Sequence, residues 1–151
     1  MNKLELKEYL SSKFPAFPVE ETIDFPVLRV PKEKIFATVK QLKEDDATQF
    51  NFLFCQTAVD YQPDLEMVYH LSSTHYRHDL MIKVTLSDRD KPTVDSITPI
   101  FTAAELFECE IFDLFGIHFD GFAGLRRLFM PVDWPGFPLR KDYVDNDMIT
   151  R

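Results

Sequence analysis

The stretch that decides the fold is residues 66–86, EMVYHLSSTHYRHDLMIKVTL. Its first part alternates Met67, Tyr69 and Leu71 with other side chains at a period of two, and residues 79–86 repeat the alternation with apolar even positions. Residues 73–77 between the two parts are polar. A period of two is typical of strands, so the stretch predicts an antiparallel β-hairpin.

Further strands are predicted on both sides of this hairpin. Residues 49–61 also alternate, and Phe50, Phe52 and Phe54 stand among Leu53 and Cys55. Apolar side chains on both faces are typical of a strand buried in the middle of a sheet, so we expect a central position for it. Residues 24–30 and 94–98 are predicted as two more strands.

Helical spacing occurs in three segments. Leu6, Leu10 and Phe14 recur four residues apart before Pro15 ends the pattern, and residues 31–43 form a second amphipathic segment. The third helix is expected at 103–115, opened by a capping box in residues 102–105, TAAE. These elements together predict a sheet with helices on one face.

Composition limits the class of protein. At 151 residues the chain has the length of one domain. Its net charge of −8 disfavours binding to nucleic acid or anionic lipid. The two cysteines, Cys55 and Cys109, lie far apart, which predicts neither a disulfide framework nor a zinc or iron–sulfur site. The acidic N-terminus and the lack of a run of about 18 apolar residues predict a chain that is neither exported nor inserted in a membrane.

The last part of the chain differs from the rest. All four glycines lie between Gly116 and Gly136, among several prolines, so residues 116–151 are predicted as an irregular arm that follows a core of residues 1–115 in the same single domain. The arm is rich in aromatic rings. These rings either fold back on the domain's own sheet or wrap a partner chain.

Charge divides this region into two parts. Residues 121–143 hold four Lys or Arg and two Asp, a balance of +2, whereas residues 105–120 hold five Asp or Glu and no Lys or Arg. Opposite charges in neighbouring segments favour charge-assisted hydrogen bonds. We therefore expect the acidic side chains to fix the arm through its arginines, within the chain or at its border. The residues concerned are Glu108, Glu110 and Asp113 with Arg126, Arg127 or Arg140.

No catalytic constellation is apparent in the sequence. Glu108 and Glu110 project about 200° apart on a helix, so they cannot face one substrate. His75 and His78 lack further ligands for a metal and are expected at the surface. Cys109 stands between two acidic residues and is expected to be inert. These observations favour a binding or assembly subunit over an enzyme with its own active site.

Three ordered motifs carry a resemblance to a known family. They are ECEIFDLFGI at 108–117, LRRL at 125–128 and PLRKDY at 138–143, and the upstream stretches TAVDY (57–61), VYHL (68–71) and SITP (96–99) extend the match. Together they resemble the thirty-kilodalton subunit, also called the C subunit, of NADH:quinone oxidoreductase, respiratory complex I. Cys109, Phe122 and Phe137 depart from the family pattern, which usually has Arg at the first position and His at the other two; Asp is also usual near Gly124.

The resemblance implies a fold, a place and a set of residues. It implies an α+β, two-layer domain with a mixed sheet and no cofactor of its own, since NADH, FMN, iron–sulfur clusters and quinone belong to partner subunits. It implies a structural subunit of a proton-translocating oxidoreductase, with no catalytic centre in this chain, docked beside the quinone-reducing subunits D and B. Its expected place is peripheral, on the cytoplasmic side of a bacterial inner membrane. The expected partner-binding and structural residues are Glu108, Glu110, Asp113, Arg126, Arg127, Trp134, Arg140, Lys141, Asp142 and Tyr143.

Two other interpretations stay open from the sequence. The chain is alternatively the equivalent subunit of a membrane-bound hydrogenase, or of a quinone oxidoreductase that takes electrons from ferredoxin or a deazaflavin. A second alternative is a free-standing adaptor with the same fold. An independent enzyme would need a site that the residues do not supply.

Overall fold

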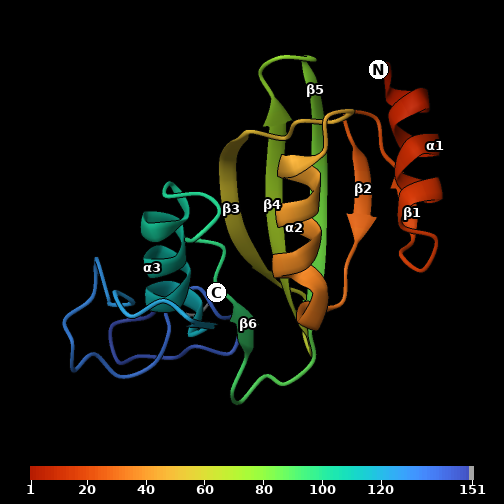
Figure 1. Cartoon of the computed structure of the whole chain (residues 1–151). Helices are drawn as coiled ribbons and strands as arrows, with labels where there is room; N and C mark the ends of the chain where they lie inside the picture. The colour runs from red at the N-terminus through yellow and green to blue at the C-terminus, as the bar shows by residue number, and fades with distance from the viewer. Residues whose placement is uncertain (150–151) are drawn as a thin grey trace.

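The structure, a computed structural model, describes residues 1–149, so the last two residues of the predicted arm, 150 and 151, lie outside the described residues. Eleven elements are built from this chain (Figure 1). In order they are α1 Lys3–Lys13, β1 Val19–Glu21, β2 Pro26–Arg29, the 3-10 helix η1 Lys32–Lys34, α2 Ile35–Glu44, β3 Phe52–Asp60, β4 Leu65–Ser73, β5 His78–Leu86, β6 Thr93–Asp95, α3 Ala104–Phe115 and β7 His118–Asp120.

The predicted hairpin forms the middle of a five-stranded sheet of order β1-β2-β5-β4-β3. Strands β4 and β5 pair antiparallel along their full lengths, with Tyr69 opposite Ile82, and β2 joins β5 in parallel. The sheet is therefore mixed, and the α+β class is confirmed. β1, a short strand paired antiparallel with β2, was not predicted because its three residues are too few to show a period.

Strand β3 lies at the edge of the sheet, so its predicted central position was wrong. Its phenyl rings on one face are not covered, and Phe52 and Phe54 are 50% and 38% exposed. A register shift between Leu53 and Cys55 changes the alternation at this point. β3 thus has apolar residues on both faces although only one face packs on the core and the other is open.

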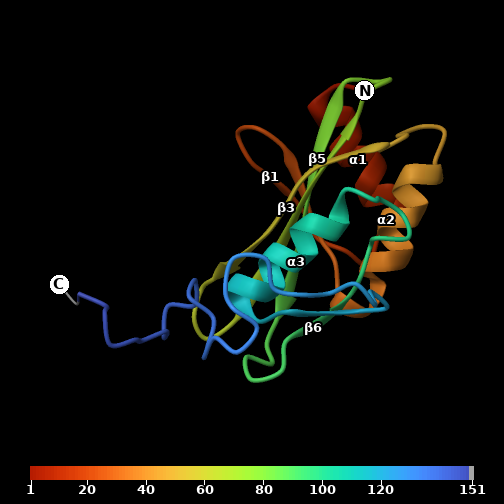
Figure 2. The ribbon, with the colours of Figure 1, turned by 90° about the vertical axis from the view of Figure 1, so that its left-hand side faces the viewer.

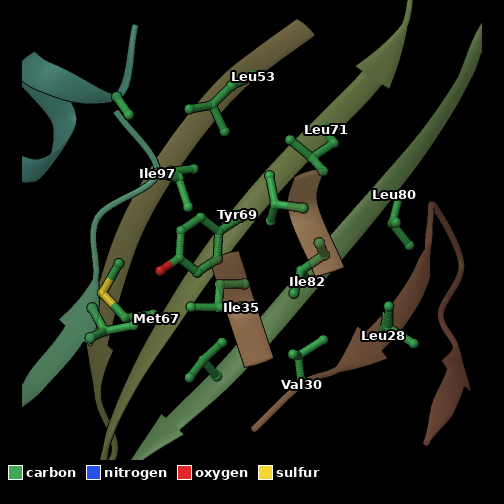
Figure 3. Packing of buried hydrophobic residues seen from close by; sticks show 14 of the residues in the cluster. Leu28, Val30, Ile35, Leu53, Met67, Tyr69, Leu71, Leu80, Ile82 and Ile97 are labelled. Carbon is green, nitrogen blue, oxygen red and sulfur yellow. The ribbon is translucent and has the colours of Figure 1, made fainter. Parts of the chain in front are cut away.

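The helices cover one face of the sheet, as predicted. Figures 1 and 2 show α1 and α2 on the same face, with α3 beside β3. Between the layers lies the apolar core, where Tyr69, Ile82 and Leu28 of the sheet belong to the same cluster as Ile35 of α2 (Figure 3). Burial of this continuous apolar surface is the main source of stability for such a domain.

The capping box predicted at the start of α3 is not formed. The helix spans the predicted residues, but its N-cap is Ala103 and no side chain caps it, so the predicted box of residues 102–105 is absent. Backbone turns take its place, since the N–H groups of Ala104 and Glu105 donate to the carbonyls of Phe101 and Thr102. These bonds, each from an N–H to the carbonyl three residues earlier, satisfy the N–H groups at the helix end, so the side-chain bonds of a capping box are not needed.

The predicted strand at 94–98 is shorter than expected and has a partner. β6 pairs in parallel with β7, which puts Val94 opposite Phe119 at the beginning of the arm. Beyond β7 the described arm is irregular, as predicted. No helix within residues 1–149 has the length and apolar character that crossing a bilayer requires.

Candidate functional site

The arm wraps around the C-terminal end of α3, beside β6 (Figures 1 and 2). It starts at Gly116, which ends the helix in the left-handed region with φ of 73°. A Cβ atom at this position would lie 2.5 Å from the ring of Phe137, which belongs to the returning part of the arm. Glycine is therefore required twice here, for its backbone conformation and for the close approach of the ring.

The arm supplies hydrogen-bond donors to the end of α3. A helix leaves its last four carbonyl groups without partners, and these must be satisfied elsewhere. Here the N–H of Gly116 donates to the carbonyl of Phe112 at 2.9 Å, and Nη1 of Arg127 donates to that of Asp113 at 3.3 Å. The N–H of Leu139 donates to the carbonyl of Leu114 at 3.0 Å, and Nε of Arg140 donates to that of Phe115 at 2.6 Å.

Asp113 is the inner anchor of the arm. Its carboxylate is fully buried, and Oδ2 accepts three backbone N–H groups, those of residues 128, 129 and 130, at 3.1, 2.6 and 3.1 Å. Nη1 of Arg127 lies 3.2 Å from Oδ1. Burial alone would raise the pKa of Asp113, but the three N–H groups and Arg127 outweigh it and lower the pKa. The predicted pairing of Asp113 with an arginine of the arm is present within the chain.

Arg127 joins this anchor to the rest of the arm. Its Nη2 donates to the carbonyls of Trp134 and Gly136, and its guanidinium lies over the ring of Phe137 at 5.1 Å. The guanidinium of Arg140 lies on the same ring, also at 5.1 Å. Phe137 is a position where this sequence departs from the pattern of the family it resembles, and its ring is enclosed by the arm's own cations.

A second anchor was missed by the sequence analysis. Asp60, at the end of β3, is 3% exposed and takes both terminal nitrogens of Arg89, at 2.7 and 2.6 Å. The backbone N–H of Lys141 donates to the same carboxylate at 2.8 Å, and Arg89 also pairs with Asp142 at 3.0 Å. The hydrogen bonds from Arg89 hold the pKa of Asp60 well below its usual range. The signal available in the sequence was the position of Asp60, an acidic residue at a place in the strand where the alternation directs side chains inward.

Glu108, Glu110 and Arg126 do not take part in these anchors, so the pairing predicted within the chain is wrong for them, while a pairing of Glu110 and Arg126 at the border of the chain stays a prediction. Glu108 is buried and faces the chain before α3, where it accepts from Oγ of Ser96 at 2.7 Å and from the N–H of Ile97 at 2.9 Å. Burial raises the pKa of Glu108 despite these bonds. Glu110 is exposed, and the guanidinium of Arg126 donates to a carbonyl of its own loop. Helix positions two residues apart face opposite ways, as expected.

The remaining aromatic residues mostly fold back on the domain. Phe119 is buried, and Phe122 packs against the core. Nε1 of Trp134 donates to the hydroxyl of Tyr143 at 3.1 Å, and this hydroxyl donates to Asp145 at 2.9 Å. Trp134 and Tyr143, two of the expected residues, are therefore in contact within the arm.

The outer side of the arm is apolar and exposed. Phe129, Val132 and Leu139 are 64%, 94% and 53% exposed. Of the fifteen large hydrophobic side chains that are exposed within residues 1–149, seven lie between 128 and 149. Several exposed apolar side chains on one ordered segment favour an interaction surface. Phe129, Val132 and Leu139 are called the outer apolar surface below.

Histidine and cysteine contribute little that is chemically reactive. His75 is exposed as predicted, but His78 is buried, with Nε2 2.8 Å from the carbonyl of Thr48, because it is the first inward residue of β5. Cys109 is buried, and its thiol lies 3.7 Å from the carbonyl of Gly124. In the described part of the chain, no three or more His, Cys, Asp or Glu residues gather as metal ligands.

Comparisons with known proteins agree with this architecture. Residues 28–147 match the family described as respiratory-chain NADH dehydrogenase, 30 Kd subunit. The C subunit of the NADH-quinone oxidoreductase of Moorella thermoacetica is 44% identical over 136 residues, which are 89% of this chain and 90% of that protein. The C/D subunit of the NADH-quinone oxidoreductase of Phocaeicola vulgatus is 36% identical over 79% of this chain, which corresponds to only 23% of that longer protein.

A solved structure has the same fold. It belongs to the membrane-bound sulfane sulfur reductase, an archaeal respiratory membrane complex, and one of its polypeptides matches with a TM-score of 0.79 and 27% identity. The alignment covers 95% of this chain and 86% of that one. The family match spans most of the chain, and the curated relative from Moorella matches over nearly its whole length. The chain therefore belongs to the family of the 30 Kd subunit of respiratory-chain NADH dehydrogenase.

Proposed function

We propose that the chain is the C subunit of a proton-translocating NADH:quinone oxidoreductase and acts there as a structural subunit without a cofactor of its own. In this role it docks against the quinone-reducing subunits D and B through the arm. NADH, FMN, iron–sulfur clusters and quinone belong to the partner subunits. Its place is peripheral, on the cytoplasmic side of a bacterial inner membrane.

The observation that carries this proposal is the two-sided character of the arm. Its inner side is fixed by Asp113, by Asp60 with Arg89, and by the end of α3. Its outer side exposes Phe129 and Val132. A segment held rigid from within loses little conformational entropy on binding, so its apolar surface is well suited to a permanent partner.

The C/D protein of Phocaeicola vulgatus supports the D subunit as the neighbour. Its name joins C and D in one protein, and the part of it that matches this chain is 23% of its length. Two subunits that work as one polypeptide are expected to lie side by side. We extend this arrangement to the present chain, where C and D are separate.

A second candidate is the equivalent subunit of a respiratory membrane complex with a different electron acceptor. The polypeptide of the sulfane sulfur reductase favours it, because the two chains share a fold over nearly their whole lengths. The structural role of the arm would be the same in either complex. The identity of the co-assembled subunits separates the two candidates.

Purification from native membranes tests the proposal. The full chain would carry an affinity tag, and the proteins that remain bound after mild solubilisation would be identified by mass spectrometry. We expect subunits D and B together with the NADH-oxidising subunits. Subunits of a sulfur reductase or hydrogenase in their place would favour the second candidate, and recovery of the chain alone would favour a free-standing adaptor and contradict the docking role.

A further inference from the structure

Four arginines within residues 1–149 are half-buried, and Arg140 differs from the other three. Each of the others lies against a carboxylate, whereas Arg140 has no carboxylate partner in the described part of the chain. Buried cations are normally paired, because removing an unpaired charge from water is costly. The three pairs are Arg29–Glu20, Arg89–Asp60 and Arg127–Asp113, at 2.5, 2.6 and 3.2 Å.

The hydrogen bonds of Arg140 use two of its three guanidinium nitrogens. Nε donates to the carbonyl of Phe115 at 2.6 Å and Nη1 to the carbonyl of Arg89 at 3.0 Å. Nη2 has no acceptor among the described residues. Burial, followed by the nearby charge of Arg89, lowers the pKa of Arg140. The carbonyl of Phe115 lies at the negative end of the α3 dipole, which offsets part of the cationic charge.

Arg140 lines a groove in the arm. The groove has a volume of about 390 Å³ and is formed by residues between Pro135 and Val144. Its lining includes Pro135, Phe137, Arg140, Asp142, Tyr143 and Val144. The charges of Asp142, Asp60 and Asp90 act on Arg140 from nearby, but none of these carboxylates hydrogen-bonds to it, and Asp142 accepts from Arg89 at 3.0 and 3.3 Å.

Charge around the groove selects the occupant. Lys141 is exposed beside it, and within residues 1–149 its side chain pairs with no carboxylate. Residues 121–143, which contain Arg140 and Lys141, carry a balance of +2 in a chain whose net charge is −8. A planar guanidinium with free N–H groups, walled by aromatic rings, is suited to bind a carboxylate through paired hydrogen bonds.

We propose that this groove receives an Asp or Glu side chain of the partner subunit and that Arg140 binds its carboxylate. The inference rests on the proposed function and adds the chemistry of the contact. The outer apolar surface supplies buried area, while Arg140 fixes the register of the partner segment, as a buried charge pair does at many interfaces.

Zero-length cross-linking in the assembled complex tests this contact. A carbodiimide joins an amine to a carboxylate that touches it, with loss of water, and does not react with a guanidinium. The variant Arg140→Lys in a Lys141→Arg background places the single amine of this pair at position 140, and Lys141→Arg alone is the matched control. We expect a cross-linked peptide between position 140 and an Asp or Glu of another subunit in the double variant and none in the control.

The outcomes separate this inference from the docking role itself. If the complex stays intact and position 140 links only to its own chain, such as to Asp142, or to nothing, the carboxylate contact is wrong while docking stands. If the unsubstituted chain assembles with no other subunit, the proposed function fails and this inference with it.

A second variant measures the contribution of the contact. Arg140→Gln keeps donors toward the end of α3 but removes the charge, and we expect about a tenfold or greater loss of the chain from the complex during a salt wash. Melting of the isolated full chain, measured in parallel, reports any loss of the intrachain bonds. Retention equal to the unsubstituted chain, with a normal melt, would overturn the proposal.

Discussion

Asp113 and Glu108 lie on the same helix and are both buried, yet their pKa values move in opposite directions. Asp113 receives three backbone N–H groups and a guanidinium, which together stabilise its charged form. Glu108 receives one N–H and one hydroxyl, and the cost of burial prevails. The number and charge of the donors decide which form each carboxyl group adopts.

Replacing Asp113 should therefore destabilise the protein strongly. Asp113→Asn removes the charge that compensates Arg127, and it cannot present oxygen to the three N–H groups and to Arg127 at once. We expect a loss of about 3 kcal/mol in the free energy of unfolding, measured by urea denaturation of the full chain. Asp133→Asn, on the exposed part of the same arm, is the control and should change it by less than about 0.5 kcal/mol. Equal effects of the two variants would contradict the anchoring role.

The raised pKa of Glu108 predicts that stability depends on pH. Its pKa in the folded chain is raised above the unfolded value, so its contribution to stability is fully present below the unfolded pKa, about 4.3, and is lost as the pH rises through the folded pKa. Glu108→Gln cannot ionise. We expect the variant to be more stable than the unsubstituted chain at pH 7.5 and to lose this advantage near pH 4, as followed by thermal melts across that range. A constant difference at all pH values would refute this.

At the level of elements, the junction between α3 and the arm depends on one glycine. Gly116 has a positive φ, and the ring of Phe137 fills the space where a Cβ would lie. Gly116→Ala should cost about 2–5 kcal/mol, because the cost of the left-handed backbone adds to that of displacing the ring. Gly121→Ala is the matched control, since its φ is also positive but nothing lies within 4 Å, and it should cost only about 1–2 kcal/mol. Chemical denaturation of both variants checks the difference, and equal losses would show that the ring yields freely.

The sequence predicts where helices and strands form better than it predicts which of them lie side by side. The hairpin of β4 and β5 and the three helices follow from periods that a few adjacent residues display. The edge position of β3 does not, because alternation reports which side chains are apolar and not what covers them. The capping box in residues 102–105 matched in composition, but the backbone turn before α3 made it unnecessary.

The same limit applies to the candidate site. The pairing of Asp113 with Arg127 follows from an acidic helix beside a basic segment, and it was predicted in outline. Asp60 and Arg89 hold the arm from β3 and from the loop after β5. Contacts between residues so far apart along the chain leave no periodic trace, and only the three-dimensional fold brings them together.

For the whole molecule, the sheet and helices form a rigid base that presents the arm. The core stabilises α3, and the end of α3 and Asp60 position the arm beside it (Figure 2). The arm exposes the outer apolar surface. A surface organised before binding allows assembly with little further ordering. We propose that this surface holds the chain in its complex.

Recovery of the complex with a double variant of the outer apolar surface tests this role. Phe129→Asp with Val132→Asp places two charges on exposed positions that no core contact needs, and Ile23→Asp, at a position 95% exposed in the turn before β2, is the matched control. We expect both tagged full chains to melt like the unsubstituted protein, the control to co-purify with its partner subunits, and the double variant to lose at least about nine-tenths of them. Co-purification of the folded double variant at the level of the control would contradict the account.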